Sequence, residues 1–385
     1  MKNVAILGST GTIGRNTLDV ICRHGRAFRV VALAAGSNSR LLEEQVRAFR
    51  PEIVSLERKE DAEAFRQKTR KMALRVTYGL EGAEEIGGYG KNDIVVSAIA
   101  GINGLRPTLA AVRAGKKVAL ANKESMVVAG SILQKEARIS GAQILPVDSE
   151  HSGVFQCLVK ESARHIKTVT LTASGGPFFR TPMRLLRTKT VEEALAHPRW
   201  KMGKKVTVDS ATLMNKGLEL IEARWLFDLD PGQLRILIHP QSIVHALVEM
   251  RDGSVIAQLS PTDMKIPIQY ALTYPERRDA VLPSLDLGRV RTLEFFPVEE
   301  KRFPLIRLAW QALAEGESYP VALNAANEAA VAAFLARKIR FTDIHEVIRR
   351  TMAGHLKKKV RSLEDVFEVD RAVREQTIQT LQKRY

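Results

Sequence analysis

The 385-residue sequence predicts an α/β protein whose N-terminal part is a Rossmann-like, doubly wound parallel sheet. Three observations lead to this expectation. Apolar strands and helices alternate over residues 1–147, strands surround one strong helix over 148–275, and the period is helical over 304–385. We therefore expect a Rossmann-like domain, a central α+β domain, a linker over 276–303 and a C-terminal helical bundle.

The first domain is justified by its alternating pattern. Its first strand ends in a Gly-rich turn, and the following helix carries Leu18, Ile21 and Cys22 on one face. Strands are expected within residues 2–7, 28–36, 52–56, 93–101, 116–125 and 142–150. Because helical runs such as the one at 105–115 separate these strands, we expect them to pair in parallel.

After residue 147 strands and helices no longer alternate regularly. We expect strands within residues 168–176, 235–250 and 254–260, and a helix over 211–227. A stretch that contains Pro283 and Pro297 links them to a segment rich in Ala, Leu, Glu and Arg. That segment predicts helices within 305–316, 321–339, 341–356 and 362–382.

The bulk composition is that of a folded, soluble protein. Apolar residues make up 45% of the chain, and no apolar run approaches the roughly 18 residues of a membrane span. Cys22 and Cys157 offer neither a disulfide framework nor a metal-ligand spacing, and no signal peptide precedes the first strand. We therefore expect a cytoplasmic protein with no membrane partner.

The net charge of +16 predicts anionic partners. The basic residues are nevertheless spread along the chain, aromatic residues make up only 6%, and no nucleic-acid-binding motif organises them. A basic surface that attracts phosphorylated small molecules explains the charge more simply than nucleic-acid binding does.

A nucleotide site is predicted at the first turn. Gly8, Gly11 and Gly14 lie between a strand and a helix, where glycine lets the backbone approach a pyrophosphate. The alternative is an ordinary tight turn. The second strand runs into residues 36–40 without an acidic residue to bind a ribose hydroxyl, which favours NADPH over NADH unless these are merely loop residues.

Three acidic residues predict a metal site. On an extended chain, Asp148 and Glu150 after the last strand of the first domain would point to the same side. At helical spacing, Glu219 shares a face with Asn215 and Lys216, although a simple surface ion pair would have the same spacing. Three carboxylates without a histidine or thiolate pattern suit a hard divalent cation, Mg²⁺ or Mn²⁺.

Two further stretches are typical of anion sites, although each alone is more often an ordinary loop. Ser174 precedes two glycines at a strand end, where hydroxyl and N–H groups can hold phosphate oxygens. His197 and Trp200 lie in a segment with Pro and Gly that suggests a mobile lid. His239 and His245 lie near one strand, and we interpret both as buried supporting groups rather than metal ligands.

The motifs GSTGTIG, ANKES, VDSEHS, TASGGPF, HPRWKMG and VDSATLMNKGLELIEARWLF occur in this order. The chain thereby closely resembles the 1-deoxy-D-xylulose 5-phosphate reductoisomerase family, and HPQSIVH and DGSVIAQLSPTDMKIPIQYAL extend the resemblance over essentially its whole length. The resemblance implies a homodimer with an NADPH domain, a central catalytic and dimerisation domain and a C-terminal four-helix domain. It also implies isomerisation of 1-deoxy-D-xylulose 5-phosphate and its reduction to 2-C-methyl-D-erythritol 4-phosphate, in the non-mevalonate isoprenoid pathway.

The resemblance further implies roles for individual residues. The metal ligands would be Asp148, Glu150 and Glu219. Lys123, Ser149 and Glu150 would contact the oxygen-bearing end of the substrate, and its phosphate would be held by Ser174, Ser210, Asn215 and Lys216, with His197 and Trp200 closing over it. NADPH would be contacted by Thr10, Gly11, Thr12, Ile13, Gly36, Ser37, Asn38, Asn122, Glu124 and Gly203. The catalytic group would be Lys123, Asp148, Glu150, Glu219 and His197.

The sequence departs from part of this family at one position. Ser37 stands where some members carry a basic residue, and Arg40 is the candidate that compensates. Two rival functions remain open. One is another metal-assisted NAD(P)-dependent oxidoreductase, such as a hydroxy-acid or semialdehyde dehydrogenase, and the other is a dinucleotide-sensing regulator that binds nucleic acid.

Overall fold

The computed structural model describes residues 1–158 and 163–384 and divides the chain into two compact units. The first unit comprises residues 1–125, 133–152 and 263–283. The second comprises 126–132, 153–262 and 284–385. The first unit thus includes a segment that follows the central strands in sequence. The domain boundaries expected from the sequence run continuously along the chain, and they stay a prediction.

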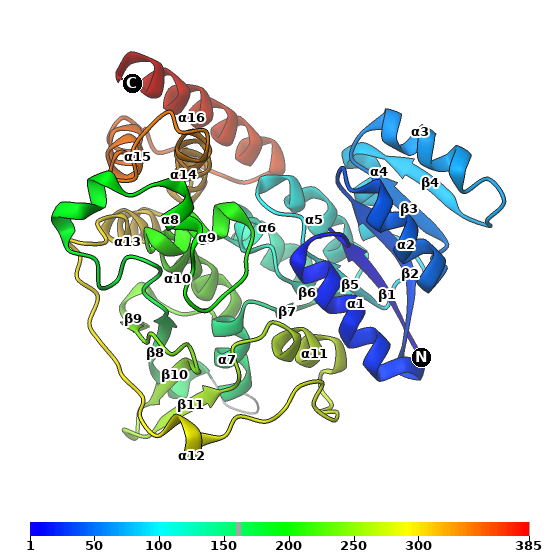
Figure 1. Ribbon diagram of the computed structural model, residues 1–385, viewed down its shortest axis with the longest axis horizontal. Helices are drawn as coiled ribbons and strands as arrows, with labels where there is room; N and C mark the ends of the chain where they lie inside the picture. The colour runs from blue at the N-terminus through cyan, green and yellow to red at the C-terminus, as the bar shows by residue number, and fades with distance from the viewer. Residues whose placement is uncertain (159–162, 385) are drawn as a thin grey trace. The chain divides into compact units, whose positions relative to one another are not determined.

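Seven parallel strands within residues 1–147 form the sheet of the first unit in the order β4-β3-β2-β1-β5-β6-β7 (Figure 1). They are β1 (Lys2–Leu7), β2 (Phe28–Ala35), β3 (Ile53–Leu56), β4 (Arg75–Tyr78), β5 (Ile94–Ser97), β6 (Lys117–Leu120) and β7 (Gln143–Pro146). In register, Val4 of β1 lies between Val30 of β2 and Ile94 of β5. The doubly wound sheet is confirmed, and β4 is a strand that the pattern analysis missed.

Helices cover both faces of this sheet. They are α1 (Thr12–His24), α2 (Ser39–Phe49), α3 (Lys59–Lys68), α4 (Gly79–Gly87), α5 (Leu105–Arg113), α6 (Lys123–Ser140) and α11 (Lys265–Thr273), with short 3-10 turns at Gly25–Ala27 and Ile102–Gly104. Right-handed crossovers place α1 to α3 on one face and α4 to α6 on the other, because the strand order reverses after β4. Helix α11 packs against α1, β6 and β7.

The sheet of the second unit has the order β11-β10-β8-β9. Its strands are β8 (Ile166–Ala173), β9 (Leu234–Ile238), β10 (Val244–Met250) and β11 (Val255–Leu259). Strands β8 and β9 are parallel, and the other pairs are antiparallel. The expectation of a single strand over 235–250 was wrong, because a turn at Pro240 and Ser242, with φ of 51° at Ser242, separates β9 from β10.

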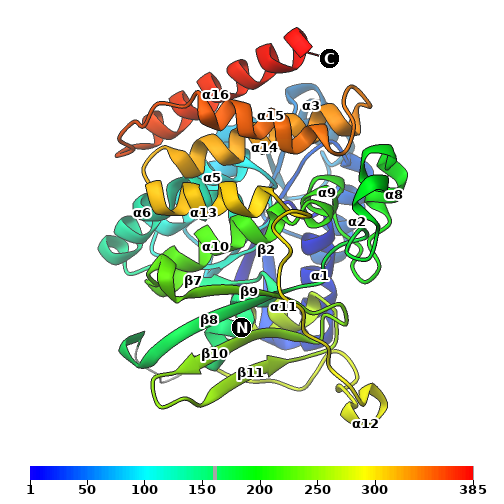
Figure 2. The ribbon, with the colours of Figure 1, turned by 90° about the vertical axis from the view of Figure 1, so that its left-hand side faces the viewer.

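Helices stack above this sheet in layers (Figure 2). Helix α10 (Met214–Phe227) packs against α13 (Leu305–Glu315), α13 packs against α14 (Tyr319–Leu335), and α14 packs against α15 (Asp343–Ala353) and α16 (Leu363–Arg384). These last four helices confirm the four that the sequence predicts after residue 304. The remaining helical segments are α7 (Ser149–Cys157), α8 (Val191–Leu195), α9 (Lys204–Ala211), α12 (Leu287–Val290) and the 3-10 turns Ala163–His165, Met183–Thr188 and Pro231–Gln233.

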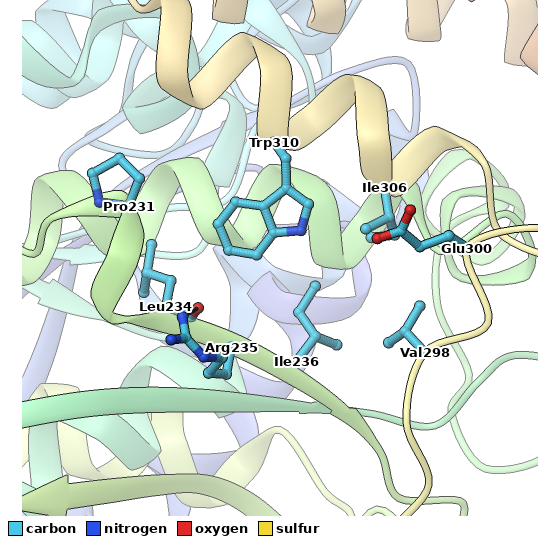
Figure 3. Close-up of a pocket in the computed structure, with 8 residues that line it drawn as sticks. All are labelled: Pro231, Leu234, Arg235, Ile236, Val298, Glu300, Ile306 and Trp310. Atoms are coloured by element: carbon cyan, nitrogen blue, oxygen red, sulfur yellow. Dashed lines mark hydrogen bonds between the residues drawn. The ribbon is translucent and has the colours of Figure 1, made fainter.

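Residues 276–283 of the predicted linker belong to the first unit, and residues 284–303 belong to the second. Phe296 bridges to Ile238 of β9, and its ring lies 5.3 Å from that of Phe179. A cavity of about 320 Å³ opens beside this contact (Figure 3). Trp310 and Ile306 project into it from α13. It contains none of the predicted site residues. Among the described residues, no helix combines the length and the apolar character that a membrane crossing requires.

Candidate active site

The first turn of the chain has the geometry of a nucleotide site. Gly8 has a φ of 87°, and a side chain there would collide with the Ala98 carbonyl oxygen, 2.6 Å from its Cβ position. At Gly14 a Cβ would lie 2.4 Å from the Gly8 oxygen, so the α1 backbone packs directly onto the turn. The turn lies where β1 adjoins both β2 and β5, the switch point at which doubly wound sheets bind ligands. Thr10 to Ile13 lie in this turn and in the first turn of α1.

The end of β2 carries the next group of predicted cofactor residues. Gly36 and Ser37 follow the strand, and the Asn38 side chain caps α2 by accepting a hydrogen bond of 3.1 Å from the Leu41 N–H. Glu57, which follows β3, approaches this turn, with its Oε2 3.4 Å from the Cβ position of Gly36. No acidic residue stands at the end of β2 itself. Glu57 comes to this turn through the parallel pairing of β2 with β3, which the spacing of residues along the chain does not reveal.

Residues at the end of β6 form another part of the same edge. Asn122 is buried, caps α6 through a 2.8 Å hydrogen bond from the Ser125 N–H, and donates to the Gly101 carbonyl oxygen at 2.9 Å. It therefore ties the loops after β5 and β6 together. Glu124 is also buried. The structure thus brings the predicted cofactor residues of the first unit to one edge of the sheet, whereas Gly203, which precedes α9, belongs to the second unit.

Asp148 and Glu150 lie at the start of a helix. The expectation that both point to one side of an extended strand was wrong, because β7 ends at Pro146 and α7 begins at Ser149. The Glu150 N–H lies 3.4 Å from Asp148 Oδ1, and the Ser149 hydroxyl donates to Glu150 Oε2 at 2.7 Å. An acidic side chain in the first helical turn is stabilised by the exposed N–H groups there.

Lys123 meets Asp148 within the first unit. Its Nζ lies 2.5 Å from Asp148 Oδ2, and the two side chains are only 9% and 12% exposed. Burial by itself would raise the pKa of the Asp148 carboxyl, but Lys123, His151 and Glu150 favour its ionised form and hold the pKa well below its usual value. Asp148 is therefore an anion at neutral pH, as a cation ligand must be.

The predicted face of α10 forms within the second unit. Asn215 Nδ2 donates to Glu219 Oε1, and Lys216 Nζ donates to Glu219 Oε2. The Lys216 and Glu219 side chains are 3% and 1% exposed. The simple surface ion pair that the spacing also allowed is thus excluded, because the pair is buried.

Ser174 and His197 are 23 residues apart in sequence but lie in contact in the structure. His197 Nε2 lies 2.9 Å from the Ser174 hydroxyl, and His197 Nδ1 accepts hydrogen bonds from the N–H groups of Arg199 and Trp200. Burial lowers the pKa of His197 to about 4, so the ring is neutral at pH 7 and its proton is on Nε2. The Ser174 oxygen then accepts from His197 and from the Gly176 N–H, and its own proton is available to an anion.

Ser210 lies beside this pair. It occupies the last turn of α9 rather than the approach to a helix start, since the predicted helix over 211–227 begins only at Met214. Gly176 has a φ of 66°, and its Cβ position lies 2.6 Å from the Ser210 carbonyl oxygen, so the two predicted phosphate segments are in direct contact. Trp200 packs near His245, which is buried like His239, as expected of supporting groups.

The donor chemistry fits the predicted cation. Asp148 and Glu150 of the first unit and Glu219 of the second offer only carboxylate oxygens, the ligands that Mg²⁺ and Mn²⁺ prefer. That all three bind one ion stays a prediction.

Family comparisons decide the classification. One family model, 1-deoxy-D-xylulose 5-phosphate reductoisomerase, matches residues 4–130, and two models of reductoisomerase C-terminal domains match residues 144–227 and 259–376. The chain belongs to this family. It is 49% identical over 380 residues to the reductoisomerase of Geobacter metallireducens and 48% identical over 375 residues to that of Prosthecochloris aestuarii. These alignments cover 97–98% of this chain and 98% of each relative.

Solved reductoisomerases share the whole fold. The Zymomonas mobilis enzyme in complex with NADPH matches with a TM-score of 0.93 at 39% identity, over 99% of both chains. A reductoisomerase in complex with NADPH, fosmidomycin and magnesium matches with a TM-score of 0.94 at 39% identity, over 99% of this chain and 98% of that one. The resemblance found in the sequence motifs is confirmed.

The lowered pKa of His197 predicts how the free energy of unfolding depends on pH. Between about pH 6.5 and 4 the unfolded chain binds a proton at His197 that the folded protein resists, so the free energy of unfolding should fall as the pH falls through this window. Below about pH 4 His197 is protonated in both states, so its contribution to the decrease in the free energy of unfolding should stay constant.

His197→Gln removes this titration. Chemical denaturation at several pH values should give a shallower decline between pH 6.5 and 4 for the variant than for the wild type. Equal declines would show that His197 is not buried as a neutral ring.

Proposed function

We propose that this reductoisomerase-family protein converts 1-deoxy-D-xylulose 5-phosphate into 2-C-methyl-D-erythritol 4-phosphate, with NADPH as the reductant and Mg²⁺ or Mn²⁺ as the metal. The observation that carries the proposal is the full-length match to a reductoisomerase bound to NADPH, fosmidomycin and magnesium. The residues at the site support it, since the chain supplies the carboxylates, hydroxyls and cations that such a reaction needs.

The chain's own residues have distinct tasks in this proposal. Ser174, Ser210 and Lys216 hold the phosphate, and this distant binding energy fixes the reacting end of the substrate. Asp148, Glu150 and Glu219 hold the metal ion, which when bound supplies a Lewis acid for the substrate's oxygen atoms. Lys123, paired with Asp148, adds positive charge at the oxygen-bearing end.

The cofactor contacts are proposed at the edge of the first sheet. The turn at Gly8–Gly14 and the N-terminus of α1 receive the pyrophosphate, because free N–H groups point out of a helix start. The 2′-phosphate faces the loop after β2, where Ser37 supplies a hydroxyl and Arg40 a positive charge. Glu57 also reaches this loop near Gly36. Arg40 itself lies 3.6 Å from the Glu44 carboxylate on the next turn of α2.

The assembly and location are also proposals. A homodimer is supported by β11, an edge strand on which Val255 and Ile256 are 58% and 38% exposed. Such apolar side chains on an edge strand suit a second copy of the chain. A cytoplasmic location is supported by two free thiols, Cys22 and Cys157.

A steady-state assay tests the function. NADPH oxidation should require both 1-deoxy-D-xylulose 5-phosphate and Mg²⁺ or Mn²⁺, and chelation of the metal should stop it. Absence of turnover with this substrate would overturn the proposal and favour another NAD(P)-dependent oxidoreductase. Specific nucleic-acid binding that resists moderate salt, without turnover, would favour the regulator instead.

Glu219→Gln tests the metal ligand on α10. The neutral amide keeps the shape of the side chain but loses its charge, so Mn²⁺ binding should weaken and turnover should fall by about a hundredfold or more. NADPH affinity should hardly change, because the proposed cofactor residues lie elsewhere. Calorimetric titrations with Mn²⁺ and with NADPH measure both effects, and unchanged metal affinity would remove Glu219 from the ligand set.

Lys216→Ala tests the phosphate contact. Loss of one charged hydrogen bond should raise the KM for the sugar phosphate about tenfold or more, with a smaller change in kcat. The KM for NADPH is the internal control. An unaltered KM for the sugar phosphate would argue against a phosphate-holding role for Lys216.

A further inference from the structure

Three of the proposed phosphate residues lie on one sharp bend between two helices. We call residues 209–217 the α9–α10 corner. Leu213, with a φ of 62°, makes the bend, its N–H donates to the Ser210 carbonyl oxygen at 3.1 Å, and its own carbonyl oxygen accepts from the Lys216 N–H at 3.1 Å. Ser210 on one arm and Asn215 and Lys216 on the other are thus fixed relative to each other by backbone hydrogen bonds.

The corner is anchored to the C-terminal helices by a buried polar contact. Asn327 of α14 donates from Nδ2 to Asp209 Oδ1 at 2.8 Å, across 118 residues of sequence. Asn327 is 0% exposed and Asp209 1% exposed. Asp209 directly precedes Ser210, and its other oxygen lies 2.9 Å from Lys205 Nζ. A hydrogen bond to a buried carboxylate is strong and directional, so it fixes the rotation of α9 about its axis.

A second contact holds the other arm of the corner. A Cβ at Gly217 would lie 2.6 Å from the Ala309 Cβ of α13, so the α10 backbone packs directly onto that helix. Gly217 follows Lys216 in sequence. Both arms of the corner therefore rest on the helical bundle, one through a hydrogen bond and the other through close packing.

The Asn327 amide contacts the corner through its Nδ2 group. Its Oδ1 is buried and has no hydrogen-bond partner among the described residues. The partner of the Nδ2 group, Asp209, directly precedes Ser210, a proposed phosphate residue.

We propose that Asn327 is a positioning residue for phosphate binding. Through Asp209 it sets the orientation of α9 and so directs Ser210 toward the phosphate, opposite Ser174 and beside Asn215 and Lys216. The C-terminal bundle is then part of the substrate-binding machinery, although it contributes no side chain to the phosphate itself. This inference rests on the proposed function.

The chain provides a matched control for the test. Asn324 lies one turn before Asn327 on α14, is equally buried, and also has an Oδ1 without a partner among the described residues. Its Nδ2 donates to Glu328 at 3.1 Å, within α14 itself. Asn324→Ala and Asn327→Ala therefore remove the same atoms from the same helix. Only Asn327→Ala removes the hydrogen bond between α14 and α9.

The experiment compares Michaelis constants in the full-length protein. Asn327→Ala should raise the KM for 1-deoxy-D-xylulose 5-phosphate about tenfold and leave the KM for NADPH within about twofold. Asn324→Ala should change neither by more than about twofold, even where both variants lower the thermal midpoint alike. Equal rises in the sugar-phosphate KM for the two variants would overturn the inference, since a general loosening of the bundle would then be the cause.

A second experiment exchanges the side chains of Asp209 and Asn327. Asn327→Asp alone places two carboxylates together and should raise the same KM, whereas the double variant Asp209→Asn with Asn327→Asp restores an amide–carboxylate pair and should recover most of the loss. If the double variant folds but its KM for the sugar phosphate does not recover, Asn327 does not position the phosphate site through Asp209. If the wild-type protein does not turn over the substrate, the proposed function is wrong, and so is the role of Asn327 that rests on it. If the wild type turns over normally and the variants have unchanged KM values, only the role proposed for Asn327 is wrong.

Discussion

The constraint on which this structure depends is that a charge removed from water must be met by an opposite charge or by hydrogen-bond donors. Lys123 meets Asp148 in the first unit, and Lys216 meets Glu219 in the second. These side chains are between 1% and 12% exposed. Two buried ion pairs are costly as plain stability elements. They are expected where a charged substrate and a metal ion use the same groups.

The same constraint explains which elements carry the site. Parallel strands end together at one edge of a doubly wound sheet, and helix starts there expose N–H groups that can meet negative charge. Asp148 and Glu150 lie at such an edge, and so do the Gly-rich turn and Asn122. In the second unit, Gly176 after Ser174 lets the end of β8 pack against Ser210 at the end of α9, and a left-handed bend at Leu213 leads from α9 into α10. Buried polar side chains hold these irregular segments in place.

Local sequence spacing predicted the side-chain contacts on α10 correctly. The face formed by Asn215, Lys216 and Glu219 follows from the 3.6-residue period alone, and the contacts on α10 agree with it. The Gly-rich turn likewise follows from the absence of side chains where backbone meets backbone. Glu150 was placed wrongly because the two-residue period of β7 was extended past Pro146, whereas the chain starts a helix at Ser149. A pattern a few residues long does not reveal where one period gives way to another.

The sequence by itself determined the alternation of strands and helices in the first unit apart from β4, the doubly wound class of its sheet, the four C-terminal helices and the family to which the chain belongs. These depend on periodicity and on motifs that are contiguous in the chain. Only the tertiary structure decided that Glu57 approaches Gly36, that His197 meets Ser174, and that Asn327 holds Asp209. Such contacts join residues from different elements. Their geometry depends on how strands pair and helices pack, which no local spacing encodes.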